Sequence, residues 1–233
     1  MKIILIRHAE PDYSIDSLTN KGWKEAEILS ERVQKLNVKK FYVSPLGRAR
    51  DTAKTALKGT GIEPEVLPWI REFEGKCYDP RTGRLRNCWD LLPGDWTKYE
   101  EMYDKDNWVN APIYREMNVG AEYEKVKEGI DSLLLEYGYK REGNYYKIEK
   151  STDDTIVIFC HMAVSLIIIG YLIGAPAPVM LHGFFAAPST FFEIETEERA
   201  DEIAFFRVRA LGDYSHLYAA DEPCSDSGFK RGL

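Results

Sequence analysis

The sequence is poor in cysteine and lacks any long apolar run, and both shortages restrict the class of protein. Its four cysteines form neither a CxxC pair nor a zinc-ligand spacing, so we interpret them as free thiols in a reducing compartment. No stretch reaches the length of a membrane span, and the opening MKIILIRH is too short for a secretory signal. These absences predict a cytoplasmic protein with no membrane partner.

Long basic runs are also missing. The 233 residues carry a formal net charge of −7, from 38 acidic and 31 basic residues. This balance argues against nucleic acid or an anionic membrane surface as a partner. An anionic ligand would have to be attracted by a few local arginines and histidines. With 44% hydrophobic residues and no internal repeat, the chain is long enough for a single α/β domain over residues 1–233.

What the sequence does contain is an alternation of apolar runs and amphipathic segments. Short apolar runs predict strands over residues 2–6, 40–44, 64–68 and 154–160, and helical spacing predicts helices over 18–36, 45–58 and 162–174. The second helix is expected to begin at Ser44-Pro45. Two alternating runs, 189–196 and 202–211, predict an antiparallel pair at the sheet edge. This order predicts an α/β fold with a mostly parallel central sheet and helices on both faces.

Residues 74–154 differ in composition from the rest of the chain and predict an inserted cap region. They contain Trp89, Trp96 and Trp108 together with many tyrosines, prolines and glycines. Inside this segment an apolar stripe predicts a helix over residues 121–139, and residues 139–150 predict a polar hairpin. The polar tail from Ala219 to Leu233 is expected to be loose.

Charged side chains stand where the predicted strands end. Arg7 and His8 follow the first strand, His161 follows the late strand, and Arg48 lies early in the second helix. The carboxyl ends of strands in a doubly wound sheet meet at one crevice, so these four side chains are expected to converge there. A helix amino terminus near Ser44 would add its positive dipole end. Such a pocket suits a dianion, of which phosphate is the common one.

A second histidine in a phosphate pocket also suggests chemistry. An unprotonated imidazole is a competent nucleophile toward phosphorus, and water can release phosphate from the resulting phosphohistidine. The alcohol that leaves needs a proton, which a buried carboxylic acid can supply. Glu72 and Glu74, in the stretch IREFEG, are the candidates for this acid. The sequence shows no metal-ligand spacing, so no metal or other cofactor is expected.

Several short motifs together resemble those of the histidine phosphatase superfamily, the group that includes cofactor-dependent phosphoglycerate mutases. The motifs are Arg7-His8-Ala9, the D-x-L-T-x-x-G step from Asp16 to Gly22, the stretch from Ser44 to Ala53, Ile70-Arg71-Glu72, and His161-Met162. They occur in the family's order and span most of the chain. The resemblance implies a three-layer α/β/α sandwich.

The resemblance also implies roles for individual residues. His8 would be phosphorylated, Arg7, Arg48 and His161 would hold the phosphoryl group, and Glu72 would be the proton donor. Three positions depart from the family pattern. Ala9 and Met162 replace glycines, and Ser14 stands where an asparagine is common, as a shorter hydrogen-bonding arm to the substrate. The mutase signature that follows RHG is absent, which favours hydrolysis over mutase chemistry.

We therefore expect a metal-independent phosphomonoesterase that acts on a small phosphorylated metabolite, with the cap setting substrate choice. The cap's aromatic residues suggest a partly apolar or ring-bearing leaving group. Two alternatives stay open, namely a phosphoglycerate-type mutase and a catalytically weak phosphate-binding regulatory protein. The sequence also leaves open whether the chain forms a homodimer.

Other residues have plainer interpretations. Cys160, beside His161, is expected to be an inert buried thiol on the opposite face of the strand. His182 is a candidate further phosphate donor, while a metal site that combines it with His216 lacks a ligand spacing. Four arginines in or near the cap are interpreted as mainly surface charges, of which one or two could meet a second anionic group: Arg71, Arg81, Arg84 and Arg86.

Overall fold

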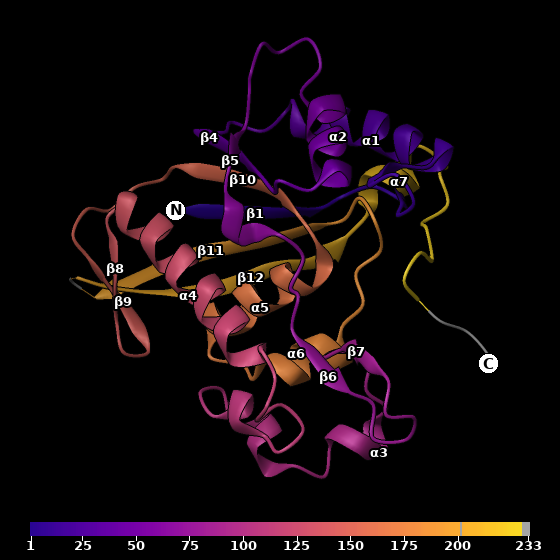
Figure 1. Cartoon of the computed structure of the whole chain (residues 1–233). Coiled ribbons are helices and arrows are strands. Elements are labelled where there is room, and N and C mark those ends of the chain that lie inside the picture. The colour runs from indigo at the N-terminus through magenta and orange to yellow at the C-terminus, as the bar shows by residue number, and fades with distance from the viewer. Residues whose placement is uncertain (201, 230–233) are drawn as a thin grey trace.

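The computed structural model describes residues 1–200 and 202–229 and is built around an eight-stranded mixed sheet (Figure 1). The strand order is β5-β4-β10-β1-β11-β12-β9-β8, with parallel pairing from β5 to β1 and antiparallel pairing from β1 to β8. The strands of this sheet are β1 (Lys2–Arg7), β4 (Lys40–Val43), β5 (Glu65–Val66), β8 (Tyr139–Glu142), β9 (Tyr145–Ile148), β10 (Thr155–Cys160), β11 (Phe191–Ala200) and β12 (Ile203–Asp213). The predicted α/β class, with a parallel part and an antiparallel side, is confirmed.

The central strands are apolar throughout because both of their faces are covered. On β1, Ile3 and Leu5 point into the larger hydrophobic core, while Ile4 and Ile6 point into a second core on the other face. Successive side chains of a strand alternate between the two faces, so a doubly covered strand needs an unbroken apolar run. The sheet, with a hydrophobic core on each face, is the middle one of three layers.

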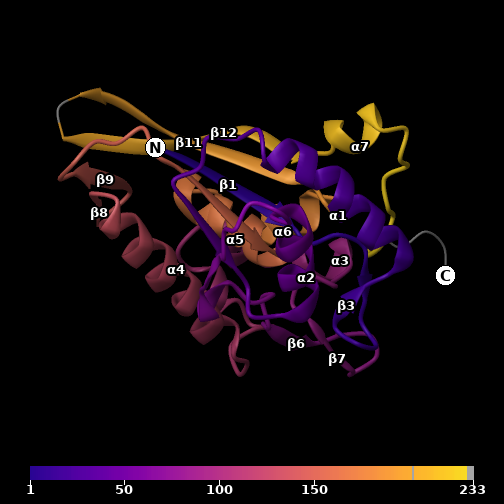
Figure 2. The ribbon, with the colours of Figure 1, turned by 90° about the horizontal axis from the view of Figure 1, so that it is seen from above.

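Helices cover the sheet on both sides (Figures 1 and 2). On one side lie α1 (Asn20–Val33), α2 (Gly47–Ala56) and α7 (Ser215–Ala219), and on the other lie α4 (Val119–Glu136), α5 (Met162–Ile173) and α6 (Ala177–Gly183). Helix α1 begins at an N-cap threonine, Thr19, whose hydroxyl accepts the N–H of Gly22 at 3.0 Å. Its buried stripe, Ala26, Leu29 and Val33, matches the helical spacing in the sequence.

The start of α2 differs from the prediction. The helix begins at Gly47, three residues after Ser44, and its N-cap residue is Leu46. The Ser44 hydroxyl accepts the N–H of Leu46 at 3.3 Å and also bonds to His161. The first helical N–H, that of Gly47, donates to Asp16 at 2.7 Å. The amino terminus of α2 is therefore occupied by a side chain of the protein, and the predicted dipole site for an anion at Ser44 is wrong.

The segment predicted as a cap divides into two parts. Its first part contains the small pair β6 (Lys76–Tyr78) and β7 (Leu85–Asn87), with short helices α3 (Pro93–Trp96), η2 (Glu100–Tyr103) and η3 (Trp108–Asn110). Its second part joins the main body, since β9 pairs with β12 in the central sheet. The predicted hairpin over 139–150 is present as β8 and β9, which widens the antiparallel side beyond the predicted pair.

Three further short elements complete the described chain: β2 (Pro11–Asp12), β3 (Ser17–Leu18) and η1 (Pro68–Ile70). The tail predicted to be loose is mostly exposed but makes specific contacts at Glu222 and Phe229, and residues 230–233 lie outside the described part. Glu222 forms ion pairs with Lys21 (2.6 Å) and Lys24 (2.5 Å), and Phe229 contacts Phe185. No helix within the described residues is long and apolar enough to cross a membrane.

Candidate active site

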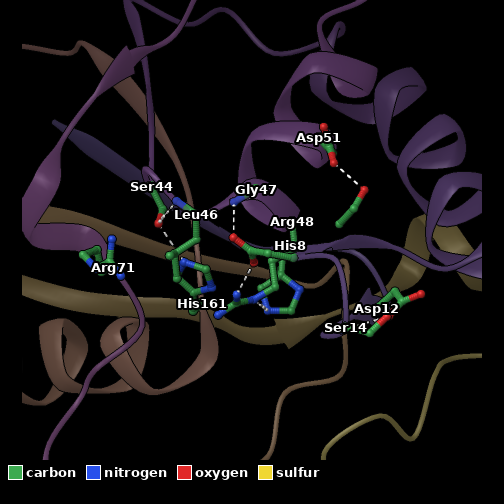
Figure 3. A network of polar contacts seen from close by, with 12 residues as sticks. His8, Asp12, Ser14, Ser44, Leu46, Gly47, Arg48, Asp51, Arg71 and His161 are labelled. Carbon is green, nitrogen blue, oxygen red and sulfur yellow. Dashed lines mark hydrogen bonds and ion pairs between the residues drawn. The ribbon is translucent and has the colours of Figure 1, made fainter.

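Two parallel strands bring the two histidines together. Strands β1 and β10 are neighbours in register, with Arg7 opposite Cys160, so the next residue of each strand, His8 and His161, emerges at the same edge. Their ring centroids are 5.1 Å apart, and both side chains are buried (Figure 3). The predicted convergence of histidines from the two strand ends is confirmed.

The tautomer of His8 follows from its neighbours. Its Nδ1 lies 2.8 Å from the Ala9 carbonyl oxygen, which can only accept, so Nδ1 carries the proton. Its Nε2 accepts the Nε–H of Arg48 at 3.3 Å and therefore carries a lone pair and no proton. Burial, with the positive charges of Arg7 and Arg48, holds the pKa of His8 well below the ordinary 6.5. His8 thus presents an unprotonated nitrogen at neutral pH.

Arg48 is held in place by the carboxylate of Asp16, which is not among the predicted site residues. Its Nη1 donates to Asp16 at 2.6 Å, while the second Asp16 oxygen accepts the Gly47 N–H. The same carboxylate therefore fixes both the start of α2 and the guanidinium on its first turn. The D-x-L-T-x-x-G step contained Asp16, but nothing in its spacing showed which side chain it would bind.

Arg7 points into the same site from the end of β1. Its guanidinium donates to the carbonyl oxygens of Ala186 and Ser227 and lies 3.8 Å from the sulfur of Met162. Its Nε is buried and has no partner among the described residues. Neither carbonyl partner could be predicted, because both come from segments far away along the chain.

His161 is oriented by Ser44 at the end of β4. The Ser44 Oγ and His161 Nε2 are 2.7 Å apart, and the other ring nitrogen, Nδ1, is buried without a partner among the described residues. Burial and the neighbouring His8, Arg48 and Arg7 lower the pKa of His161 well below 6.5. One nitrogen of His161 is therefore fixed by Ser44, and the other has no hydrogen-bond partner among the described residues.

The structure separates the two candidate acids. Glu72 lines a cavity together with Arg7 and Arg48, and its carboxylate accepts the N–H groups of Phe73 (2.9 Å) and Val164 (3.1 Å). Burial raises its pKa above the ordinary 4.5, against those hydrogen bonds and the charge of Arg7. Glu74 is exposed and pairs with Arg71 at 3.4 Å. Of the two, only Glu72 is placed to give a proton inside the cavity.

The remaining predicted binding residues lie differently. His182 lines the cavity, with its Nδ1 bonded to the Pro178 carbonyl at 2.8 Å. Ser14 is exposed and its hydroxyl donates to Asp12 at 2.6 Å, and Figure 3 draws no contact from it to either histidine. A substrate-binding role of Ser14 stays a prediction.

The two departures from the family glycines have different surroundings. The methyl group of Ala9 packs with Leu18 and Ala26 in a small apolar cluster. The Ala9 N–H donates to Thr52 at 3.0 Å. Met162, in contrast, lines the cavity. The first departure is absorbed by the core, whereas the second changes the wall against which a ligand would rest.

The other sulfur and imidazole groups lie outside the site. Cys160 is buried, bonds to the Ser165 hydroxyl at 3.2 Å, and has a pKa raised by burial to about 12, as expected of an inert thiol. His216 packs against Phe191 on the other side of the sheet. Within the described part of the chain, no three His, Cys, Asp or Glu side chains gather in a way that could hold a metal ion.

A comparison with protein-family models identifies the family of this chain. The family model of the histidine phosphatase superfamily (branch 1) matches residues 3–206. The chain belongs to this superfamily. The motifs at Arg7, Asp16, Ser44, Ile70 and His161, which resembled the family in the sequence, all fall inside the matched range.

Two relatives of this chain catalyse different reactions. The adenosylcobalamin/alpha-ribazole phosphatase of Escherichia coli (strain K12) is 22% identical over 221 residues, covering 91% of this chain and 98% of the relative. A 2,3-bisphosphoglycerate-dependent phosphoglycerate mutase of Thermoplasma acidophilum is 40% identical over 180 residues, covering 67% and 87%.

Solved structures agree with the fold. The phosphoserine phosphatase of Entamoeba histolytica superposes with a TM-score of 0.61 at 19% identity, covering 93% of this chain and 98% of that one. A mycobacterial glucosyl-3-phosphoglycerate phosphatase gives a TM-score of 0.61 at 18% identity, covering 91% and 98%. At such identities the likeness shows the three-layer fold of this chain.

Proposed function

We propose that the protein is a phosphomonoesterase that works through a phosphohistidine at His8. The observation that carries the proposal is the unprotonated Nε2 of His8, whose ring bonds to the Ala9 carbonyl through Nδ1 and accepts from the Arg48 guanidinium at Nε2. An imidazole in this state is ready to attack phosphorus without losing a proton first. Membership of the superfamily supports the same assignment.

The reaction runs in two steps. The Nε2 electron pair of His8 forms a bond to phosphorus as the ester P–O bond breaks, and the leaving alkoxide takes the proton of Glu72. Water then attacks the phosphohistidine and gives a proton to the Glu72 carboxylate, and His8 leaves with its electron pair. The phosphoryl oxygens are held by Arg7, Arg48 and the free Nδ1 of His161.

Phosphate binding must displace one internal contact. Arg48 donates to the nitrogen that would bond to phosphorus, so that hydrogen bond has to break before His8 can attack. The Arg48 guanidinium can then turn its donors to the phosphoryl oxygens while Asp16 keeps hold of its Nη1. In the structure described, Arg48 thus keeps the nucleophile covered by a cation.

The test is a phosphatase assay with p-nitrophenyl phosphate in the presence of EDTA. We expect release of phosphate by the unmodified protein, loss of that activity in His8→Asn, and retention in His216→Asn, a buried histidine outside the site. Rapid quenching with a radiolabelled substrate should trap a label that is lost in acid and stable in alkali. Activity that persists in His8→Asn, or that returns only with added Mg²⁺ or Zn²⁺, would remove this mechanism.

A phosphoglycerate mutase is the second candidate, favoured by the 40% identity to the Thermoplasma acidophilum enzyme. A mutase returns the phosphoryl group to a hydroxyl of the substrate, whereas a phosphatase gives it to water. Incubation with 3-phosphoglycerate separates the two reactions, since the mutase forms 2-phosphoglycerate and the phosphatase forms inorganic phosphate. We expect inorganic phosphate as the main product.

A further inference from the structure

The first turn of α5 supplies three parts of the site. His161 is the N-cap residue of this helix, and its extended backbone leads the chain from β10 into α5. Met162 is the first helical residue and lines the cavity, while the N–H of Val164 donates to Glu72 at 3.1 Å. The turn that places His161 beside His8 therefore also places Met162 at the cavity wall.

The Met162 thioether contacts one of the guanidinium groups that we assign to the phosphoryl group. Its Sδ lies 3.8 Å from Nη1 of Arg7, and the same nitrogen donates to the Ala186 carbonyl oxygen. An Nη nitrogen of arginine carries two N–H groups, so one of them bonds to a carbonyl oxygen and the other is left with sulfur. Because thioether sulfur is a weak acceptor, this second N–H stays available for a phosphoryl oxygen.

Met162 is also open to small molecules in the cavity. The described residues include all five methionines of the chain, of which three are buried in the core: Met1, Met102 and Met180. Met117 and Met162 are partly exposed, and of these two only Met162 lines the cavity that also holds Arg7 and Arg48. A dissolved oxidant can therefore reach a sulfur atom that touches the phosphoryl site.

Oxidation changes a thioether from a weak into a strong acceptor. Hydrogen peroxide gives one oxygen atom to sulfur: a sulfur lone pair forms the S–O bond, the O–O bond breaks, and the other oxygen leaves as water with both hydrogen atoms. Sulfur loses two electrons and the peroxide gains them. The product, methionine sulfoxide, is polar, and its oxygen carries a partial negative charge.

A sulfoxide oxygen on Met162 would compete with phosphate for Arg7. On the side of Sδ that faces Nη1, this oxygen comes within hydrogen-bond distance of the guanidinium, since the sulfur itself is 3.8 Å from that nitrogen. It takes the second Nη1 donor and adds negative charge beside a site for a dianion. Arg7 is only 4% exposed, so water screens this effect weakly.

We propose that Met162 is a reversible oxidation site that regulates phosphate binding, because its sulfoxide bonds to Arg7 and lowers the affinity for the phosphoryl group. The oxidant is a peroxide, and the reductant is a thiol-dependent methionine sulfoxide reductase, which removes the oxygen as water. This inference rests on the proposed phosphatase function, since it takes Arg7 as a ligand of the phosphoryl group. It gives a role to a residue that stands where the family pattern has glycine.

The experiment treats the protein with hydrogen peroxide and locates the added oxygen by peptide mass spectrometry. Binding of inorganic phosphate is then measured by isothermal titration calorimetry and as competitive inhibition of p-nitrophenyl phosphate hydrolysis. We expect oxidation at Met162 to raise the dissociation constant and the inhibition constant by about tenfold, the scale of one hydrogen bond to a charged group. Methionine sulfoxide reductases for both epimers should reverse the rise, whereas dithiothreitol alone should not.

Variants assign the effect to one sulfur atom. Met162→Leu removes the sulfur at similar volume, so its phosphate dissociation constant should be the same before and after peroxide. Met117→Leu is the matched control and should keep the full response, since Met117 is partly exposed but lies outside the cavity. Cys224→Ser should also keep it. All four cysteines are described, and Cys224 is the one that is not buried.

A further variant imitates the oxidised side chain without any oxidant. Met162→Gln carries an amide oxygen near the position of the sulfoxide oxygen. It should bind inorganic phosphate about tenfold more weakly than Met162→Leu does. Equal binding by these two variants would show that an acceptor at this position does not compete for Arg7, which would overturn the inference.

The other outcomes separate this inference from the function on which it rests. Phosphate binding without hydrolysis would overturn the phosphatase, and the calorimetric response to peroxide would still decide the role of Met162. Oxidation at Met162 with an unchanged dissociation constant would overturn that role and leave the phosphatase standing. So would conversion of Met117 while Met162 stays unoxidised, or a full response in Met162→Leu. A protein that neither binds phosphate nor hydrolyses the ester would overturn both.

Discussion

Single residues around His8 all favour one protonation state. The Ala9 carbonyl takes the Nδ1 proton, Arg48 covers Nε2, and burial disfavours the imidazolium. The sequence indicated which kinds of residue form the site but not which atoms they contact. The sequence predicted Arg7, His8, Arg48 and His161 from their positions at strand and helix ends, whereas the preference for Glu72 over Glu74 came from the family resemblance. It could not predict backbone carbonyl partners, because a carbonyl carries no sequence signal.

The first prediction concerns Asp16, which orients Arg48. In Asp16→Asn the guanidinium loses a charge-assisted bond, whose usual contribution predicts a fall in kcat/KM of about tenfold to a hundredfold, mainly through KM. Steady-state kinetics with p-nitrophenyl phosphate measure it. Asp12→Asn, on the same loop but bonded to Ser14, is the control and should stay close to the unmodified protein. Equal effects of the two changes would show that Asp16 matters only for loop folding.

The second prediction is the pH dependence of kcat/KM. His8 must be unprotonated, and its lowered pKa moves the acid limb well below pH 6.5. Glu72 must be protonated, and its raised pKa moves the falling limb above the ordinary 4.5. Activity should therefore be highest at mildly acidic pH and fall as Glu72 ionises.

A variant identifies the falling limb. Glu72→Gln should abolish that limb, and it should slow alkyl phosphates more than p-nitrophenyl phosphate, whose leaving group needs no proton. Glu74→Gln is the matched control, since Glu74 is exposed and outside the cavity. If Glu74→Gln moved the falling limb and Glu72→Gln did not, the assignment of the acid would be reversed.

At the scale of elements, the site depends on how α2 meets the loop before α1. Strands and amphipathic helices were predicted well because buried faces leave a period in the sequence, as on β1 and α1. The start of α2 was wrong because Ser44, a residue with the right chemistry for a cap, bonds instead to His161, 117 positions away. The contact with His161, a residue distant in the sequence, therefore decided the role of Ser44, and its local capping preference did not.

The third prediction tests that junction. A Cβ at Gly47 would lie 2.1 Å from the Asp16 carbonyl oxygen, so Gly47→Ala must push the loop away from α2. We expect a loss of stability of about 1–3 kcal/mol in urea unfolding, together with weaker phosphate binding as Asp16 shifts. The control is Gly120→Ala in the first turn of α4, where the nearest atom would be 3.7 Å away. That change should be neutral or stabilising.

At the scale of the whole molecule, the folded state keeps its histidines uncharged. Burial lowers the pKa of His8, His161, His182 and His216, the last to about 4. Below the ordinary 6.5 the unfolded chain binds more protons at these positions than the folded chain does. The contribution of these histidines to the free energy of unfolding is therefore fully present above pH 6.5. It falls as the pH drops toward the pKa values of the folded state.

The fourth prediction isolates one of these histidines. Glu25 and Glu72 have raised pKa values, and their contributions are lost in the opposite direction, as the pH rises. The difference between the unmodified protein and His216→Gln removes this background. The unmodified protein should lose up to about 1.4 kcal/mol more per pH unit as the pH falls below 6.5, which is the slope of one proton. Parallel curves in urea unfolding would mean that His216 titrates alike in both states.

The two borders of the central sheet have a consequence for self-association. One border is β5, only two residues long, and the other is β8, which carries Lys140, Arg141 and Glu142 in succession. Short and charged borders discourage the addition of a foreign strand, which is the first step toward fibrils. The addition of a second copy of this chain along the sheet is accordingly disfavoured, and concentrated native solutions should resist amyloid-type growth.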